Sequence, residues 1–148
     1  MQIPDFEANG LLPSGIYDCS LETIRSRFGT FQNTDQRPVL YRKLQEYLEE
    51  ARNTKLVYSV VIDGSFVTTK SAPNDIDVIL VLYKDHDFSA ELRPFQSNPL
   101  SRRWVNRRYG FDVLVARDES AEYLEYLAFF EQVRNEPGFR KGLLKVRL

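Results

Sequence analysis

The sequence predicts a small α/β (α+β) domain, in which helices pack on a mixed sheet of about four strands and an irregular arm precedes the core. Three patterns support this fold class. β-Branched apolar runs at 57–62 and 78–82 flank a polar stretch, which is typical of strand, turn and strand. Apolar residues over 40–51 recur at helical spacing, and residues 141–148 alternate between apolar and charged side chains. The 148 residues suit a single domain with its own core.

Residues 1–33 are predicted to form an N-terminal arm and one short helix. Proline, glycine and asparagine are frequent in residues 1–19, which indicates an extended, irregular segment. Ser20 is expected to cap a helix that has Glu22 in its first turn and Gly29 just past its end.

The core, predicted to span residues 34–148, begins with a long helix. Thr34 or Asp35 is expected to start it, because Pro38 is tolerated only in a first helical turn. Its apolar residues form one stripe that would pack on a sheet. They are Leu40, Leu44, Tyr47, Leu48 and Ala51.

The second half of the core is predicted to contain a loop, a strand, a helix and a closing strand. Residues 84–99 are polar and contain two prolines, so they are expected to form a loop with little regular structure. A third strand is expected over 111–116. Asp118 is expected to cap a helix that runs to about Arg134, and residues 141–148 would form the closing strand.

Composition excludes several classes of function. The net charge of −1 gives no general attraction to nucleic acid or to membranes. The single Cys19 rules out an internal disulfide and a multi-cysteine zinc site, and the single His86, in a polar loop, argues against a histidine-based triad. No apolar run is long enough to cross a bilayer, and the N-terminus lacks the pattern of a signal peptide. The expected location is the cytoplasm.

Two carboxylates at the start of the second predicted strand indicate a metal site. Asp75 and Asp77 are separated by one residue, and on a strand such residues point to the same face. Hard divalent cations such as Mg²⁺ prefer carboxylate oxygens, and a two-metal site can hold both the attacking and the leaving oxygen of a phosphoryl transfer.

The turn between the two strands has the composition of a phosphate site. Gly64 allows close approach of the backbone, and Ser65 offers a hydroxyl and an N–H group. A helical turn beginning near Phe66 would aim further N–H groups at an anion. Lys70 is close enough in sequence to reach a phosphate, although a surface lysine without that role is an equal alternative. Each feature alone also suits an ordinary turn or a solvated strand end.

Together these residues resemble the core motif of the nucleotidyltransferase superfamily, the polymerase-β-like fold. In that family a hydrophobic strand ends in Gly-Ser or Gly-Gly, Asp-x-Asp follows, and a later strand carries a third carboxylate. Here nine residues separate Gly64-Ser65 from Asp75-Ile76-Asp77. Asp112, in Tyr-Gly-Phe-Asp-Val-Leu-Val-Ala, resembles the third carboxylate.

The resemblance implies a metal-dependent enzyme that moves a nucleoside monophosphate from an NTP to an acceptor hydroxyl and releases pyrophosphate. Asp75, Asp77 and Asp112 would hold Mg²⁺ (or Mn²⁺), and Asp112 would also help to deprotonate the acceptor. Gly64 and Ser65 would hold the β- and γ-phosphates. The chain lacks the extra helical domain with which many relatives grip the base and the acceptor.

The arm, the first helix and the stretch Asp-Gly-Ser-Phe-Val-Thr-x-Lys also resemble a family of small, uncharacterised prokaryotic nucleotidyltransferase-like proteins. This resemblance covers nearly the whole chain and brings no established activity. Small relatives of this kind often belong to toxin–antitoxin or phage-defence pairs, where they modify a protein or a tRNA. The expected partners are therefore an NTP and a protein or tRNA acceptor, such as the product of a neighbouring gene. The oligomeric state is left open.

Two alternatives accompany this hypothesis. The chain would also suit a non-catalytic interaction module, an antitoxin or accessory subunit that has kept the fold without turnover. Trp104 is surrounded by four arginines, which suit phosphate contacts or the solvated face of a helix. For Trp104 itself, a place in the core is favoured over base stacking. The arginines are Arg102, Arg103, Arg107 and Arg108.

Overall fold

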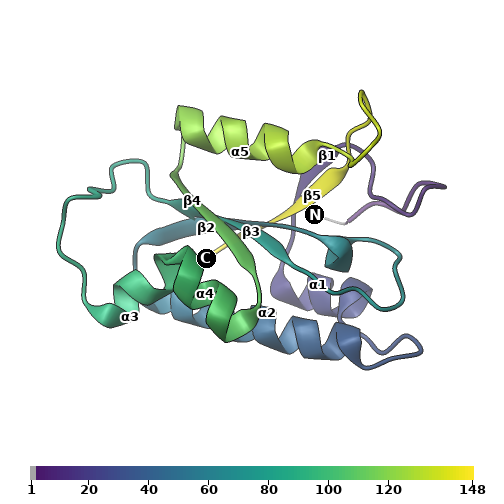
Figure 1. Ribbon diagram of the computed structural model, residues 1–148, viewed down its shortest axis with the longest axis horizontal. Helices are drawn as coiled ribbons and strands as arrows, with labels where there is room; N and C mark the ends of the chain where they lie inside the picture. Colours follow the sequence, from purple (N-terminus) through teal and green to yellow (C-terminus); the bar gives the residue numbers. More distant parts are fainter. Residues whose placement is uncertain (1–2) are drawn as a thin grey trace.

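The computed structural model describes residues 3–148 and places five strands in one mixed sheet, in the order β1-β5-β2-β3-β4 (Figure 1). Strand β2 runs antiparallel to both of its neighbours, whereas β1 is parallel to β5 and β3 is parallel to β4. The predicted mixed α/β class is confirmed, with five strands in place of about four. The strands are β1 Gly15–Asp18, β2 Val57–Asp63, β3 Asp77–Leu82, β4 Asp112–Arg117 and β5 Gly142–Arg147.

Helices lie on both sides of this sheet. In Figure 1, α5 crosses one side, and α1, α2 and α4 lie on the other. None of the helices within residues 3–148 has the length and apolar character needed to cross a membrane. The helices are α1 Leu21–Phe28, α2 Gln36–Asn53, α3 Pro94–Ser97, α4 Arg102–Tyr109 and α5 Ala121–Glu131, and two short 3-10 turns are η1 Ser65–Val67 and η2 Asn98–Leu100.

Alternation along the strands divides the core into two parts, because successive strand side chains point to opposite faces. On β3, the even-numbered residues join the larger core together with apolar residues of α1, α2 and α4. Ile79 and Val81, at odd positions, join a smaller core with residues of α5. On β2, Val60 and Ile62 belong to the larger core and Val61 to the smaller one. Within a strand, whether a residue is odd- or even-numbered therefore determines which of the two cores its side chain joins.

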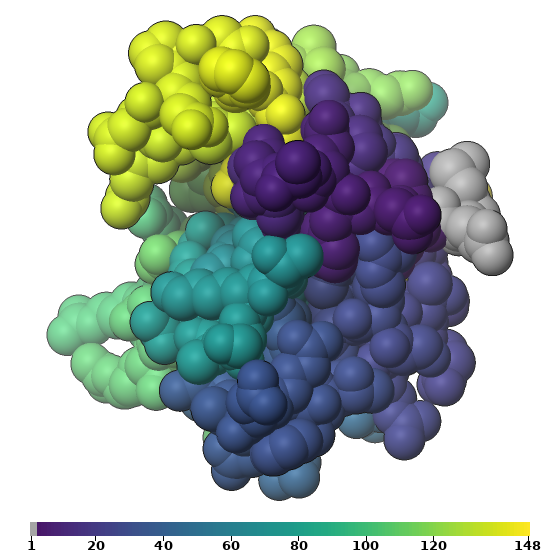
Figure 2. Space-filling model, turned by 90° about the vertical axis from the view of Figure 1, so that its right-hand side faces the viewer, coloured from purple at the N-terminus to yellow at the C-terminus, as the bar shows by residue number. Residues whose placement is uncertain are grey.

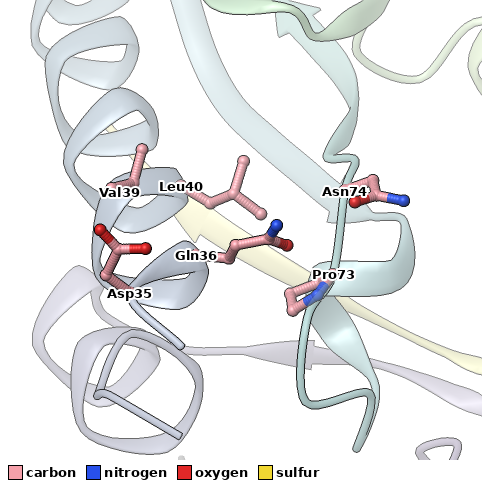
Figure 3. Close-up of a pocket in the computed structure, with 6 residues that line it drawn as sticks. All are labelled: Asp35, Gln36, Val39, Leu40, Pro73 and Asn74. Carbon is pink, nitrogen blue, oxygen red and sulfur yellow. The ribbon is translucent and has the colours of Figure 1, made fainter. Parts of the chain in front are cut away.

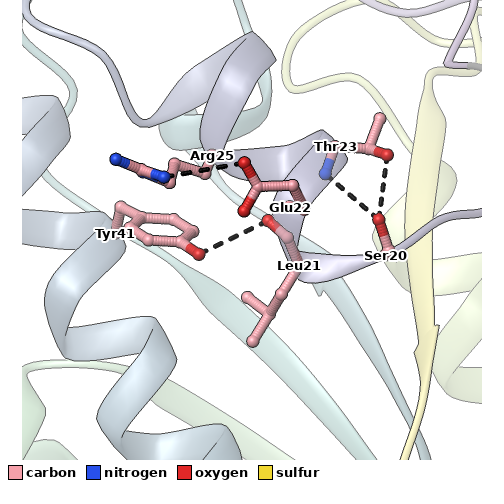
Figure 4. Close-up of polar contacts among 6 residues, drawn as sticks. All are labelled: Ser20, Leu21, Glu22, Thr23, Arg25 and Tyr41. Atoms are coloured by element: carbon pink, nitrogen blue, oxygen red, sulfur yellow. Dashed lines mark hydrogen bonds and ion pairs between the residues drawn. The ribbon is translucent and has the colours of Figure 1, made fainter.

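The first helix begins as predicted. The backbone N–H of Thr23 donates to Ser20 Oγ over 3.1 Å (Figure 4). Gly29 is the C-cap residue. The hydroxyl of Tyr41, on α2, donates to the carbonyl oxygen of Leu21 over 3.4 Å. This contact ties the start of α1 to the long helix beside it.

The long helix is also close to its prediction. It spans Gln36–Asn53 with Asp35 at the N-cap position, and Pro38 lies in its first turn. All five residues of the predicted apolar stripe are buried: Leu40, Leu44, Tyr47, Leu48 and Ala51.

The predicted irregular arm contains the fifth strand. Residues Gly15–Asp18 form β1, which pairs in parallel with β5 at the edge of the sheet. The strand is only four residues long and follows Pro13 and Ser14, so its own sequence looks like a turn. Its extended conformation depends on pairing with β5, a partner far away in the sequence.

Two other predicted boundaries were wrong. The segment 84–99, predicted as a loop, contains α3 and most of η2. The last helix is capped by Ser120, whose Oγ accepts from the N–H of Tyr123 over 3.1 Å, and it ends at Glu131. Asp118 is not the N-cap residue. Its N–H donates to the carbonyl oxygen of Leu82 over 2.8 Å, which continues the pairing of β3 with β4, and the helix begins only at Ala121.

Candidate functional site

Three carboxylates stand side by side at one end of the sheet. The strand register pairs Asp63 of β2 with Asp77 of β3, and Asp77 with Asp112 of β4. Two residues along from each of them are Val61, Ile79 and Leu114, which pack in the smaller core next to α5. Alternation therefore directs all three carboxylates to the α5 face of the sheet. We call Asp63, Asp77 and Asp112 the acidic corner.

The acidic corner lines a cleft with a volume of about 940 Å³. Most of the remaining lining comes from the end of α5 and from residues 132–141, which connect α5 to β5 and are called the C-terminal loop below. Figure 2 shows this side of the molecule, where the surface is hollowed between the yellow C-terminal loop and the teal segment after β2. The cleft is within the size range of small-molecule sites in proteins.

The charges of the acidic corner are unevenly compensated. Asp63 is buried, and its Oδ2 lies 2.9 Å from Nζ of Lys141, the residue just before β5. Burial raises the pKa of Asp63, and the ammonium of Lys141 opposes that rise. Burial raises the pKa of Asp77 to about 6, with further contributions from the charges of Asp75, Asp63 and Asp112. Asp77 therefore sits in a negative environment that a cation would relieve.

Asp75 occupies a different position from the one predicted. Strand β3 begins only at Asp77, so the alternation expected of two residues on one strand does not apply to Asp75. The side chain of Asp75 is turned to the preceding loop, where its Oδ1 accepts from the N–H of Ser65 over 3.2 Å and from the Ser65 hydroxyl. Asp75 is exposed, and its charge still contributes to the raised pKa of Asp77.

The Gly64-Ser65 turn is packed against the backbone before β3. Gly64 has a φ of 99°, and a Cβ atom there would lie 2.7 Å from the carbonyl oxygen of Asp75. Only glycine fits this turn without a shift of the backbone. Ser65 Oγ accepts from the N–H groups of Asn74 and Asp75 over 3.0 and 3.2 Å, so the hydroxyl is already engaged within the loop. The predicted helical turn is present as η1.

The first turn of α2 is hydrogen-bonded to the loop that follows the Gly64-Ser65 turn. The guanidinium of Arg37 is buried and donates to four carbonyl oxygens, those of Phe28, Phe66, Thr68 and Lys70, at 2.6–3.1 Å. Burial lowers the pKa of Arg37. The side chain of Lys70 itself is exposed, and its role in phosphate binding stays a prediction, as does that of Gly64 and Ser65.

Gln36 adds a second attachment beside Arg37. With its amide oriented to donate, Gln36 reaches the carbonyl oxygens of Ala72 and Pro73 over 3.2 and 2.7 Å. Gln36 and Pro73 border a small hollow of about 260 Å³ between α2 and the loop (Figure 3). The loop that carries Asp75 is thus fixed to α2 at several points, which defines the position of the Gly64-Ser65 turn.

The donors of the acidic corner suit a hard divalent cation, because all are carboxylate oxygens and their mutual repulsion is incompletely neutralised. In this conformation no group of three or more Asp, Glu, His or Cys side chains within residues 3–148 is arranged to hold a metal ion. Asp75 and Asp112 are both exposed, and Asp75 would have to leave its hydrogen bonds with Ser65 to join Asp77 at a cation.

Comparison with known proteins identifies a family. The model of a family of unknown function, DUF6932, matches residues 4–147. The chain belongs to this family. Searches of curated proteins and of solved structures gave no match.

The four arginines near Trp104 lie in three different environments. Arg102, at the start of α4, lines the cleft. Arg108 instead contacts Glu50 over 3.4 Å and lies over the rings of Trp104 and Tyr109. Trp104 is partly buried against the larger core, in agreement with the favoured interpretation. Arg103 and Arg107 are exposed.

Sequence reasoning did not select two residues of the candidate site, Asp63 and Lys141. For Asp63 a signal was present, because β2 and β3 form an antiparallel pair and the end of the first must face the start of the second. Lys141 had no such signal, since its position depends on β5 pairing with β2 across a long sequence separation.

Proposed function

We propose that this protein is a metal-dependent nucleotidyltransferase that transfers a nucleoside monophosphate from an NTP to a hydroxyl of a protein or RNA acceptor. The observation that carries the proposal is the alignment of Asp63, Asp77 and Asp112 on three adjacent strands at a cleft with basic side chains. The basic side chains would bind the anionic phosphates, and the carboxylates would bind the cation that neutralises their charge.

In the proposed reaction, the acceptor oxygen attacks the α-phosphorus and forms a new O–P bond. The bond between the α-phosphorus and the oxygen that bridges to the β-phosphate breaks, and pyrophosphate leaves. The hydroxyl proton passes to a carboxylate, for which the exposed Asp112 is the proposed acceptor. Asp77 and Asp112, with Asp75, would hold Mg²⁺ or Mn²⁺, which stabilises charge on the phosphates when bound.

Asp75 couples the two halves of this proposed site. Its carboxylate accepts from the N–H and hydroxyl of Ser65, which are the groups proposed to bind phosphate. A carboxylate that leaves Ser65 frees these donors for an anion and becomes available to a cation. Binding of the metal and of the triphosphate would then favour each other.

The central test replaces Asp77 with Asn, which keeps the size of the side chain and removes a charge. Purified protein is incubated with labelled NTPs, Mg²⁺ and either tRNA or the product of the neighbouring gene. We expect transfer by Asp77→Asn to fall by several orders of magnitude. Asp85→Asn is the matched control, because Asp85 is exposed beyond the opposite end of β3.

Calorimetry provides a second arm of this test. We expect wild-type protein to bind at least one of ATP, GTP, CTP and UTP only when Mg²⁺ or Mn²⁺ is present, because the carboxylates otherwise repel the triphosphate. Equal labelling by wild type and Asp77→Asn would exclude a catalytic role for the acidic corner. Absence of any metal-dependent nucleotide binding would favour the interaction module.

The alternative function is a non-catalytic interaction module, and one observation favours it. Three large apolar side chains on α5 and the C-terminal loop are more than half exposed: Leu124 at 67%, Phe129 at 64% and Phe139 at 62%. Exposed apolar groups of this kind suit contact with another protein. In a toxin–antitoxin or phage-defence pair, such a module would bind its partner equally well with or without Asp77.

A further inference from the structure

The cleft has an aromatic component that the acidic corner does not explain. Phe129, near the end of α5, and Phe139, in the C-terminal loop, both line it and are 64% and 62% exposed. A single exposed phenylalanine on a protein surface needs no explanation. Two in the lining of one cleft present flat apolar faces where a ligand would lie.

Arginines accompany these two rings. Arg102 and Arg134 line the same cleft, and neither forms an ion pair with another residue of the described chain, 3–148. By contrast, Arg140 is paired with Glu131 over 3.5 Å and Lys141 with Asp63 over 2.9 Å. The cleft therefore has two guanidinium groups that are available to an anion.

The C-terminal loop is fixed at its base and projects beyond it. The N–H of Lys141 donates to the carbonyl oxygen of Glu131 over 2.9 Å, and the backbones of Gln132 and Arg140 pair in an isolated antiparallel β-bridge. Figure 1 shows the loop extending past the end of α5. Between the two ends, the backbone hydrogen bonds close local turns. An example is the bond from the N–H of Phe139 to the carbonyl oxygen of Glu136. The loop thus presents its side chains to the cleft from a defined base.

We propose that Phe129, Phe139, Arg102 and Arg134 form the nucleotide subsite of the cleft, and we call them the aromatic wall. The two rings would stack on the base, and the two guanidinium groups would contact the triphosphate. The proposal rests on the proposed function and assigns its donor substrate to particular residues. A nucleoside triphosphate fits because it has both a π-face and several negative charges. Stacking accepts every base, so the subsite is expected to discriminate little among the four NTPs.

The test compares nucleotides with a ligand that has the phosphates but no base. The double variant Phe129→Ala/Phe139→Ala is titrated with each Mg-NTP and with Mg-tripolyphosphate. We expect about a tenfold loss of affinity for all four nucleotides and unchanged affinity for tripolyphosphate. Arg134→Ala should weaken both ligands. The matched control is Phe31→Ala/Phe95→Ala, because these rings are 66% and 54% exposed and lie outside the lining of the cleft.

The outcomes separate this proposal from the proposed function. If wild type binds nucleotides and the double variant binds them equally well, the aromatic wall is wrong and the enzyme hypothesis stands. If the double variant keeps nucleotide affinity and loses labelling of an RNA acceptor, the two rings bind the acceptor and the nucleotide assignment is overturned. If wild type binds no nucleotide with Mg²⁺ or Mn²⁺, both proposals fail. The exposed rings contribute little to the core, and melting curves verify that the variants are folded.

Discussion

The two faces of the sheet differ in how completely helices cover them. On one face, residues of α1, α2 and α4 form the larger core. On the other, α5 contributes Tyr123, Leu127 and Phe130 to a smaller core, and the cleft opens at the end where the acidic corner lies. The same strands serve both faces, because alternate residues point in opposite directions.

This difference separates the part of the sheet that supports the core from the part that carries exposed charge. Within β3, Val78 and Leu80 are fully buried in the larger core, whereas Asp77, next to Val78, faces the cleft with a raised pKa. The buried charge of Arg37 on the covered face is held by four backbone carbonyl oxygens, which accept from its two terminal nitrogens. Changes to the covered face should therefore affect folding, and changes to the open face should affect charge and ligand binding.

The largest effect on stability is expected for Arg37→Met. The substitution leaves four carbonyl oxygens without their donor, and three of the bonds lie in the loop that carries the Gly64-Ser65 turn. We expect a loss of about 3–5 kcal/mol in the free energy of unfolding, measured by urea denaturation. Arg25→Met is the control, because Arg25 is exposed and its 3.6 Å pair with Glu22 is solvated. Equal losses in the two variants would contradict the role assigned to Arg37.

A smaller effect is expected for Lys141→Met, which removes the partner of a buried carboxylate. We expect a loss of about 2 kcal/mol near pH 7, since Asp63 would be left charged and unpaired. The loss should shrink as the pH falls, because protonation of Asp63 removes the charge. A second change, Asp63→Asn, should restore part of the stability.

Lys84→Met provides the comparison for this prediction. Its pair with Glu119 is 3.7 Å long, and both side chains are mostly exposed, so little change is expected. Persistence of the full Lys141→Met loss in the Asp63→Asn background would show that the ion pair is not its cause.

The smallest effect concerns Asp77 and pH in the absence of metal. Its folded-state pKa of about 6 lies above the ordinary value of 3.8, so the folded protein binds more protons than the unfolded chain between these values. Stability due to Asp77 therefore decreases as the pH rises from about 4 to 6 and stays lower above that. With allowance for partial exposure, we expect Asp77→Asn to melt roughly 2–4 °C above wild type near pH 7.5 and at about the same temperature near pH 4.

Melting curves in EDTA measure this difference across the pH range. Asp85→Asn, at an exposed position, should follow wild type at every pH. A difference between Asp77→Asn and wild type that does not change with pH would mean that the ionisation of Asp77 is not its origin.

Local patterns predicted the elements whose own composition shows how they are buried. The runs of β2 and β3 are continuously apolar because both faces of these strands are covered, and the stripe of α2 recurs at helical spacing because one side of the helix meets the core. β1 was missed because its extended state comes from pairing with β5. The start of α5 was predicted too early, because Asp118 and Ser120 are both residue types that cap helices. The backbone N–H of Asp118 instead donates to the carbonyl oxygen of Leu82 and stays paired with β3.

The candidate site was predictable to a similar extent. Motif spacing selected Asp77 and Asp112, which the register places next to each other. It could not show that Asp75 turns toward Ser65, because that orientation depends on the geometry of the loop. Lys141 and the C-terminal loop reach the cleft only through the position of β5 in the sheet, which no local pattern specifies.

The position of β5 between β1 and β2 also has a consequence for how the protein is made. On the ribosome, β1 emerges first and finds no partner strand until residues 142–147 follow, because within the described sheet it pairs only with β5. The edge of β2 that pairs with β5 stays unpaired for the same time, and Asp63 lacks its ion-pair partner Lys141. Contacts between such distant segments form slowly. We therefore expect the sheet to close, and the cleft to acquire its final charge, only after synthesis has passed β5.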